Sequence, residues 1–256
     1  MTVLPLLWMV VVAFQRPRAI INREWTFDFA LTNFMEILSP DAVFGAQVIN
    51  SVVLVIAATA ICIGLSAFAS YSLSQLSWSP RVVLGVLAAA GVLQVVPPMT
   101  LVPGLFVTLQ NFSLTGTLGG LIILNVIFNL PFAIIMMKFY FDALPKELRE
   151  SAYIDGASEF ATFWRVMLPL AAPGLAAVAI FIGIQVWNEF LFGLIFTRGG
   201  DEAPITVGIA TLVQPQEIKW GPMAAVGTIT AVPIILLAVV ANRQIVSGLT
   251  QGAVKS

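Results

Sequence analysis

The sequence predicts an all-α integral membrane protein with about six transmembrane helices. Hydrophobic residues make up 59% of the 256 residues, whereas charged residues make up only 10%. The mean hydropathy of +0.97 is too high for a soluble domain of this length, which would need more polar surface. Several apolar runs along the chain are also long enough to cross a hydrocarbon core of about 30 Å.

The first two predicted spans differ in length. Residues 1–14 are apolar but would form a helix of only about 20 Å, shorter than the hydrocarbon core of a bilayer. A signal peptide is the alternative, but its basic n-region and small-residue cleavage site are missing. Residues 15–45 form a polar connection, expected on the outer face, and residues 48–69 form an uninterrupted second span.

Prolines interrupt the third predicted span, residues 82–109. Pro97, Pro98 and Pro103 lack the amide donor that a helix needs, so they are expected to break or kink it. Membrane proteins tolerate such breaks where neighbouring groups or a cavity satisfy the freed carbonyls. The remaining predicted spans are residues 118–137, 171–196 and 223–241.

Residues 145–169, here called the charged loop, separate the fourth span from the fifth. Ionisable groups this dense cannot lie in hydrocarbon, so the segment must be exposed to water. The distribution of lysine and arginine favours a cytoplasmic location for it, although the bias is weak. Its ionisable residues are Lys146, Glu147, Arg149, Glu150, Asp155, Glu159 and Arg165.

Two short helices are predicted within the charged loop. Pro145 suits the first turn of one, and Gly156 can adopt the left-handed conformation that ends it. Ser158 can cap a second helix that stops near Pro169. This second helix carries an apolar stripe opposite polar side chains, formed by Phe160, Phe163, Trp164 and Met167. The stripe either packs onto this protein's own spans or fills a pocket on a soluble partner, and the pattern leaves both open.

Composition excludes several functions. The net charge of −1 gives no basic surface for nucleic acid, and the chain has no histidine. Its single cysteine, Cys62, lies inside an apolar run, so neither a disulfide nor a metal site is predicted. The chain also lacks a Gly-Lys-Ser/Thr phosphate loop, so it cannot bind ATP through a loop of that kind.

The charged loop resembles the EAA loop of ABC-importer membrane subunits. The matching residues are Glu150-Ser151-Ala152, Asp155-Gly156-Ala157 and Leu168-Pro169, with Ser151 in place of the usual alanine. Residues 187–190 and the tail at residues 248–255 resemble the carbohydrate branch of the family, as in maltose and trehalose importers. Three separated motifs are more specific than any one of them.

The resemblance implies a type I ABC importer permease fold, with a single transmembrane permease domain over residues 1–256. A cytoplasmic coupling loop would occupy about residues 140–170, and a cytoplasmic tail about residues 243–256. The implied function is to carry a sugar, a di- or oligosaccharide, across the cytoplasmic membrane of a bacterium or archaeon. The chain would be a transport subunit and not an enzyme.

The resemblance also implies partners. A second permease subunit would complete a heterodimer, two ATP-binding subunits would hold ATP and Mg²⁺, and an extracytoplasmic solute-binding protein would deliver the sugar. This chain would bind no cofactor itself. The residues expected to couple it to the ATPase are Glu150, Ser151, Ala152, Asp155, Gly156, Phe160, Phe163 and Trp164. Carboxylates would make charge-assisted contacts and aromatic rings would supply buried anchors. Alternatively, Glu150 is a solvated charge that pairs with Lys146.

A second set of residues is a candidate for the substrate path: Asn125, Asn129, Trp187, Asn188 and Glu189. A carboxylate in or near a span costs about 2.5–3.5 kcal/mol, so Glu189 is expected to face a cavity or a partner. With Trp187 and Asn188 beside it, Glu189 could belong to a group that contacts a sugar, with the aromatic face of Trp187 against the ring and polar atoms against the hydroxyls. The alternative is that Glu189 fixes helix packing and that the asparagines link neighbouring helices.

An ion-coupled secondary carrier for a small polar solute is the alternative function. Such carriers show paired halves with interrupted helices and intramembrane charges. Only the third predicted span is clearly interrupted, and Glu189 is a lone carboxylate, so this alternative ranks lower. A membrane enzyme ranks lower still, because no paired acid–base residues are present.

Overall fold

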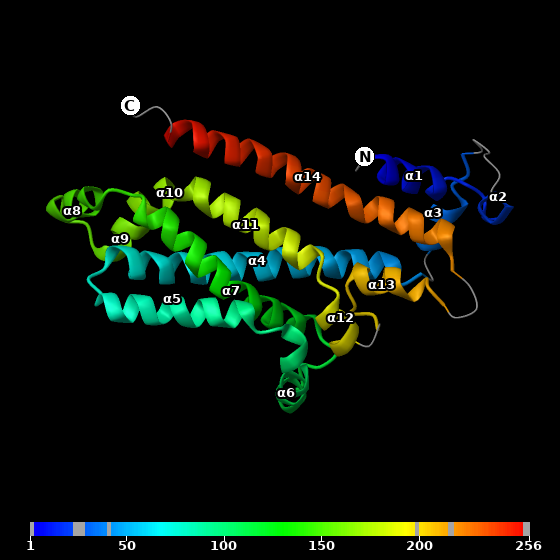
Figure 1. The fold of residues 1–256 in the computed structure, drawn as a ribbon, viewed down its shortest axis with the longest axis horizontal. Helices are drawn as coiled ribbons and strands as arrows, with labels where there is room; N and C mark the ends of the chain where they lie inside the picture. Colours follow the sequence, from blue (N-terminus) through cyan, green and yellow to red (C-terminus); the bar gives the residue numbers. More distant parts are fainter. Residues whose placement is uncertain (1–2, 23–28, 40–41, 198–199, 215–217, 253–256) are drawn as a thin grey trace. The chain divides into compact units, whose positions relative to one another are not determined.

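The computed structural model describes residues 3–22, 29–39, 42–197, 200–214 and 218–252. These residues fold almost entirely into helices, and the described part contains no β-strand beyond one isolated bridge between Val213 and Ile218. Figure 1 shows these helices in chain order, and the chain divides into two compact units. The first unit comprises Met1–Leu54, Phe112–Leu121 and Trp187–Leu236, and the second comprises Val55–Asn111, Ile122–Val186 and Leu237–Ser256. The single permease domain therefore stays a prediction.

The described helices follow the predicted order. They are α1 (Val3–Ala13), α2 (Pro17–Asn22), α3 (Thr32–Ile37), α4 (Phe44–Gln75), α5 (Pro80–Val95), α6 (Pro98–Asn111), α7 (Leu118–Asp142), α8 (Lys146–Ile154), α9 (Glu159–Thr162), a π-helical turn (Phe163–Met167), α10 (Leu168–Leu170), α11 (Ala172–Trp187), α12 (Leu191–Phe196), α13 (Ile205–Thr211) and α14 (Trp220–Gly252).

Among the described residues, α4, α7 and the Trp220–Val239 part of α14 are each long and apolar enough to cross a bilayer. Two bent helix pairs raise the number of candidate spans to five, and α1 is a shorter apolar helix of 11 residues. One pair is α5 with α6, bent by 98° at the break before Pro98. The predicted interruption of the third span is thus confirmed there, whereas Pro103 lies inside α6.

The fifth span was predicted to be continuous over residues 171–196, and this is wrong. α11 ends at Trp187 and α12 begins at Leu191. The physical reason is a side-chain cap: the Glu189 carboxylate accepts hydrogen bonds from the amides of Phe192 (2.7 Å) and Gly193 (2.9 Å). These amides belong to the first turn of α12, whose free donors would otherwise be unsatisfied.

In the first unit, a small apolar core joins α1, α3, α13 and the start of α14. Its fully or nearly buried members are Ala13, Ile37, Ile205, Leu212, Ala224, Ala225 and Val226. The buried amide of Asn33 donates to the carbonyls of Ala13 (2.9 Å) and Gln15 (2.8 Å). The segment predicted as a plain polar connection, residues 15–45, is therefore partly folded, although residues 23–28 and 40–41 lie outside the described part.

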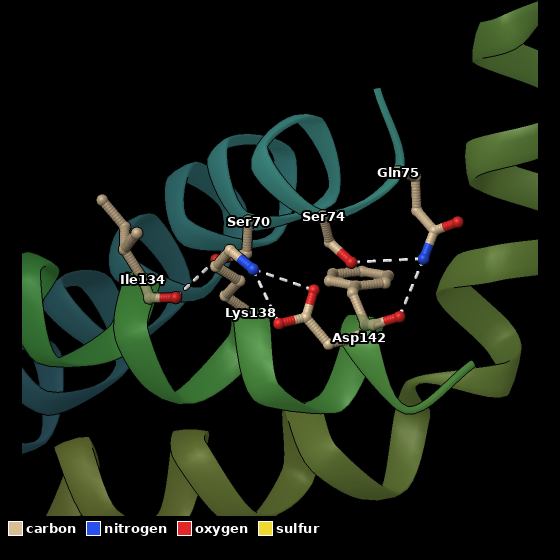
Figure 2. A network of polar contacts seen from close by, with 7 residues as sticks. Ser70, Ser74, Gln75, Ile134, Lys138 and Asp142 are labelled. Atoms are coloured by element: carbon tan, nitrogen blue, oxygen red, sulfur yellow. Dashed lines mark hydrogen bonds and ion pairs between the residues drawn. The ribbon is translucent and has the colours of Figure 1, made fainter. Parts of the chain in front are cut away.

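In the second unit, side chains of α4 donate hydrogen bonds to backbone carbonyls of α7. Ser70 Oγ donates to the Ile134 carbonyl (2.8 Å), and Gln75 Nε2 donates to the Phe141 carbonyl (2.8 Å), as Figure 2 shows. Small residues on α4, such as Ala58 and Ala67, are buried as well. Small side chains and interhelical hydrogen bonds are the usual means by which helices associate in a membrane, so this end of α4 is firmly joined to α7.

Replacing Gly174 by alanine is expected to disturb the packing of α11 on α7. A Cβ at this position would lie 2.3 Å from Cγ of Tyr140, at the base of a ring that cannot swing away freely. Overpacking of this kind costs about 1–3 kcal/mol, so the melting temperature of the purified protein in detergent should fall.

Gly183→Ala on the same helix is the matched control. Its Cβ would find its nearest neighbour at 3.8 Å, an ordinary contact, so this variant should melt at or above the wild-type temperature. Equal melting temperatures for both variants would contradict the packing described here.

Candidate functional site

The charged loop begins with α8, which starts one residue later than predicted. Pro145 is its N-cap rather than part of its first turn. The helix ends at Ile154, and Gly156 just beyond it adopts the predicted left-handed conformation, with a φ of +79°. The amide of Gly156 donates to the Tyr153 carbonyl (3.0 Å), and that of Ala157 donates to the Ala152 carbonyl (2.9 Å). These two bonds form a Schellman motif, which fixes the direction in which the chain leaves α8.

The second helix of the charged loop begins at the predicted cap. Ser158 is extended, and its hydroxyl accepts a hydrogen bond from the amide of Ala161 (3.3 Å). α9 then continues through the π-helical turn at Phe163–Met167 into α10. The segment Glu159–Leu170 is bent by 74° from α11, so it is a separate body from the span that follows it.

The π-helical turn divides the predicted apolar stripe. Phe163 and Met167 are 3% and 0% exposed, whereas Phe160 and Trp164 are 66% and 48% exposed. The expectation of one continuous stripe is therefore wrong, because a π turn holds more residues than an α turn and shifts the register. Packing onto the protein's own spans is confirmed for Phe163, and Met167 is buried as well. Trp164 meets Phe68 of α4 edge to face at 6.1 Å but keeps about half of its surface exposed.

Phe163 packs against rings at the C-terminal end of α4. Its ring stacks on that of Phe68 with centroids 4.6 Å apart and lies 5.0 Å from the ring of Tyr71. Tyr71 in turn meets Phe141 of α7 edge to face at 5.7 Å. Aromatic pairs at these separations stabilise by about 0.5–1.5 kcal/mol beyond the area that they bury.

An ion pair joins the two helices of the charged loop. Arg149 on α8 binds Glu159 on α9 through two hydrogen bonds, Nη2 to Oε2 (2.8 Å) and Nε to Oε1 (3.1 Å). The Tyr71 hydroxyl also donates to Glu159 Oε1. The guanidinium of Arg149 lies 4.9 Å over the ring of Tyr153. A two-pronged arginine–carboxylate pair is geometrically specific, so it fixes the angle between α8 and α9.

This pair shifts the pKa of both partners. The bonds from Arg149, aided by the Tyr71 hydroxyl and opposed by partial burial, hold the pKa of Glu159 below its ordinary value. The hydrogen bonds to Glu159 raise the pKa of Arg149. Both groups are therefore charged at neutral pH.

The predicted docking carboxylates lie on the outside of the charged loop. Glu150 and Asp155 are exposed, and within the described residues neither makes a side-chain ion pair. The alternative pairing of Glu150 with Lys146 is thus not seen in the described part of the chain. Ala152 is buried and Ser151 exposed. Three exposed apolar side chains beside them were not predicted: Leu148, Tyr153 and Ile154. The sequence could have indicated Ile154, because it lies four residues after Glu150 on the same face of the predicted helix.

The substrate-path candidates divide between the two units. Asn125 and Asn129 lie on α7 in the second unit, where Asn129 Nδ2 donates to the Asn125 carbonyl (2.8 Å). Trp187 is buried in the first unit, and its indole N–H donates to the Thr230 carbonyl (3.2 Å). The Glu189 carboxylate caps α12, and its backbone carbonyl accepts from the Thr206 hydroxyl. Asn188 is exposed.

These contacts support the packing alternative for Glu189, while a role in the substrate path stays a prediction for all five residues. The predicted tail, residues 243–256, continues α14 as far as Gly252. Its side chains, and residues 253–256, lie outside the described part.

Comparison with known proteins places the chain in a family. Residues 76–251 match the family described as binding-protein-dependent transport system inner membrane component. The trehalose/maltose transport system permease protein MalG of Thermococcus litoralis is 32% identical over 254 residues, 98% of this chain and 91% of MalG. The diacetylchitobiose uptake system permease protein NgcG of Streptomyces coelicolor is 33% identical over 258 residues, 98% of this chain and 83% of NgcG.

Solved structures agree on the fold. A bacterial ABC transporter involved in the import of the acidic polysaccharide alginate superposes with a TM-score of 0.79 at 19% identity, covering 93% of this chain and 89% of that one. The chain belongs to the family of inner membrane components of binding-protein-dependent transport systems. It is a multi-pass ABC importer permease of the type I fold, so the predicted family, fold and location are confirmed and the ion-coupled carrier is not favoured.

Acid is expected to weaken the tie between Arg149 and Glu159. Because the folded pKa of Glu159 lies below the unfolded value of about 4.3, the stabilisation is complete above that pH and is lost as the pH falls through the folded value. The difference in melting temperature between wild type and Glu159→Gln should therefore shrink between about pH 5 and about pH 3. A difference that stays constant over this range would contradict the assignment.

Removing the cap of α12 is expected to destabilise the first unit without any sugar present. Glu189→Ala should lower the stability by about 0.5–2 kcal/mol, and Glu189→Gln, which keeps one acceptor, by less. Glu202→Gln, at an exposed acidic residue, is the control and should melt like the wild type. A Glu189→Ala variant as stable as the control would show that the carboxylate does not hold α12.

Proposed function

We propose that this permease is one half of a heterodimer that carries a di- or oligosaccharide inward, and that its charged loop docks on a separate ATP-hydrolysing subunit. The observation that carries the proposal is the outward face of that loop. Phe160 and Trp164 remain exposed although their neighbours Phe163 and Met167 are buried. Exposed rings, together with an exposed Glu150 carboxylate on α8 that forms no ion pair among the described residues, are typical of a docking surface.

The chemistry of this face suits a protein partner. Large aromatic side chains dominate interface energies when they enter a pocket, and a carboxylate beside them adds a charge-assisted contact. On α8, Ile154 is a further exposed apolar side chain, with 87% of its surface exposed. The chain has no Gly-Lys-Ser/Thr phosphate loop of its own, so we assign ATP and Mg²⁺ to two ATP-binding partner subunits.

The choice of sugar as cargo rests on the relatives. Their names specify trehalose and maltose for the Thermococcus litoralis protein and diacetylchitobiose for the Streptomyces coelicolor protein. The trehalose transport system permease protein SugB of Mycobacterium tuberculosis is also 32% identical over 259 residues. An extracytoplasmic solute-binding protein is proposed because the family is binding-protein-dependent. A similar alginate transporter, with a TM-score of 0.68, was solved with a pentasaccharide-bound periplasmic protein.

Copurification tests the docking face. The chain would be expressed with candidate permease and ATPase neighbours, and Glu150→Ala, Phe160→Ala and Trp164→Ala would each be compared with the wild type. Loss of a buried aromatic anchor costs about 2 kcal/mol or more, so each ring variant should retain at least about tenfold less ATPase while still binding the second permease.

Phe112→Ala is the matched control, because Phe112 is an aromatic residue that is also 71% exposed. It precedes α7, whereas the charged loop follows α7, so it lies outside that loop. It should retain the ATPase fully. A wild type that recruits no ATPase, and whose uptake instead follows an ion gradient, would overturn the proposed function.

A further inference from the structure

Three parts of the charged loop converge on one residue of a distant span. Tyr71 lies near the end of α4 and is 4% exposed. Its hydroxyl donates to Glu159 at the start of α9, and its ring packs against Phe163 in the π-helical turn. Arg149 of α8 reaches the same point by holding the Glu159 carboxylate. Tyr71 and Glu159 are 88 residues apart in the sequence, so this contact is tertiary.

The end of α4 is itself part of a rigid block. Ser70 and Gln75, which flank Tyr71, donate hydrogen bonds to the α7 carbonyls of Ile134 and Phe141 (Figure 2). An ion pair between Lys138 and Asp142 lies along the same stretch of α7. A push on Glu159 would therefore move α4 together with the end of α7.

Along the chain, the charged loop is connected to α4 less directly than through these side chains. It is joined to α11 through a break with a 74° bend at Ala171, and to α7 through the short link of residues 143–145. No covalent path leads to α4 without passing through α5, α6 and α7. Within the described residues, the loop meets α4 at the side chains of Tyr71 and Phe68.

We infer that Tyr71, Arg149 and Glu159 are positioning residues that transmit movement of the charged loop to α4. This inference rests on the proposed function, because it presumes an ATPase that moves the loop. Their side chains bind one another: they set the angle between α8 and α9 and attach both helices to the span. Arginine suits the task because its planar fork binds a carboxylate at two points, which lysine cannot do.

The test uses the reconstituted importer with its partner subunits and solute-binding protein. The variants are Tyr71→Phe, which removes the hydroxyl but keeps the ring, Arg149→Glu, Glu159→Arg and the double swap of the last two. Asp142→Asn, which breaks the pair with Lys138 in the same block, is the control. Three quantities are measured: ATPase retained, ATP hydrolysed and sugar transported per ATP.

We expect the single charge reversals to keep the ATPase and its hydrolysis but to lower sugar transported per ATP by about fivefold or more. The double swap should recover most of that loss, Tyr71→Phe should show a smaller loss, and Asp142→Asn none. A merely structural role would instead lower the amount of ATPase retained together with transport, rather than transport per ATP alone.

Unchanged transport per ATP in both single reversals would overturn the inference. So would loss of the bound ATPase in step with transport, because the residues would then only shape the docking face. A wild-type complex that shows no ATP-driven uptake would instead overturn the proposed function, which keeps the two failures distinct.

Discussion

The carboxylate of Glu159 is the constraint on which the arrangement of the charged loop depends. A charge beside a span must be paired, and here the guanidinium of Arg149 and the hydroxyl of Tyr71 satisfy it together. That single group fixes α9 to α8 and both helices to α4. The rings buried around Tyr71 strengthen the same junction, while Phe160 and Trp164 are left facing outward.

The two faces of the loop suit a permease that performs no chemistry. One face is joined to a span by contacts that do not involve a partner, and the other offers aromatic rings and a carboxylate to a protein. Such a surface suits the ATP-hydrolysing subunit that we propose as its partner. The π-helical turn begins at Phe163, and it changes the helical register of the residues that follow.

Features set by neighbouring residues were predictable from the sequence. Gly156 and Ser158 end and begin helices by local backbone chemistry, and the break before Pro98 follows from missing amide donors. The junction at Tyr71 was not predictable, because nothing local links it to a carboxylate 88 residues away. The π turn was missed because the apolar spacing also fits an α-helix. The cap at Glu189 had a signal, a polar residue just before an apolar run, that the continuous hydrophobicity of the predicted span concealed.

The distance between the charged loop and α4 is the most direct measure of this account. Spin labels at two exposed positions, Glu147→Cys on α8 and Leu65→Cys on α4, would be placed in a chain whose Cys62 is replaced by serine. The pair distance would then be followed by double electron–electron resonance in the assembled importer. The account predicts the same narrow distance in the nucleotide-free and ATP-bound states, because the two elements move as one body. A distance that shifts or broadens when ATP binds would contradict it.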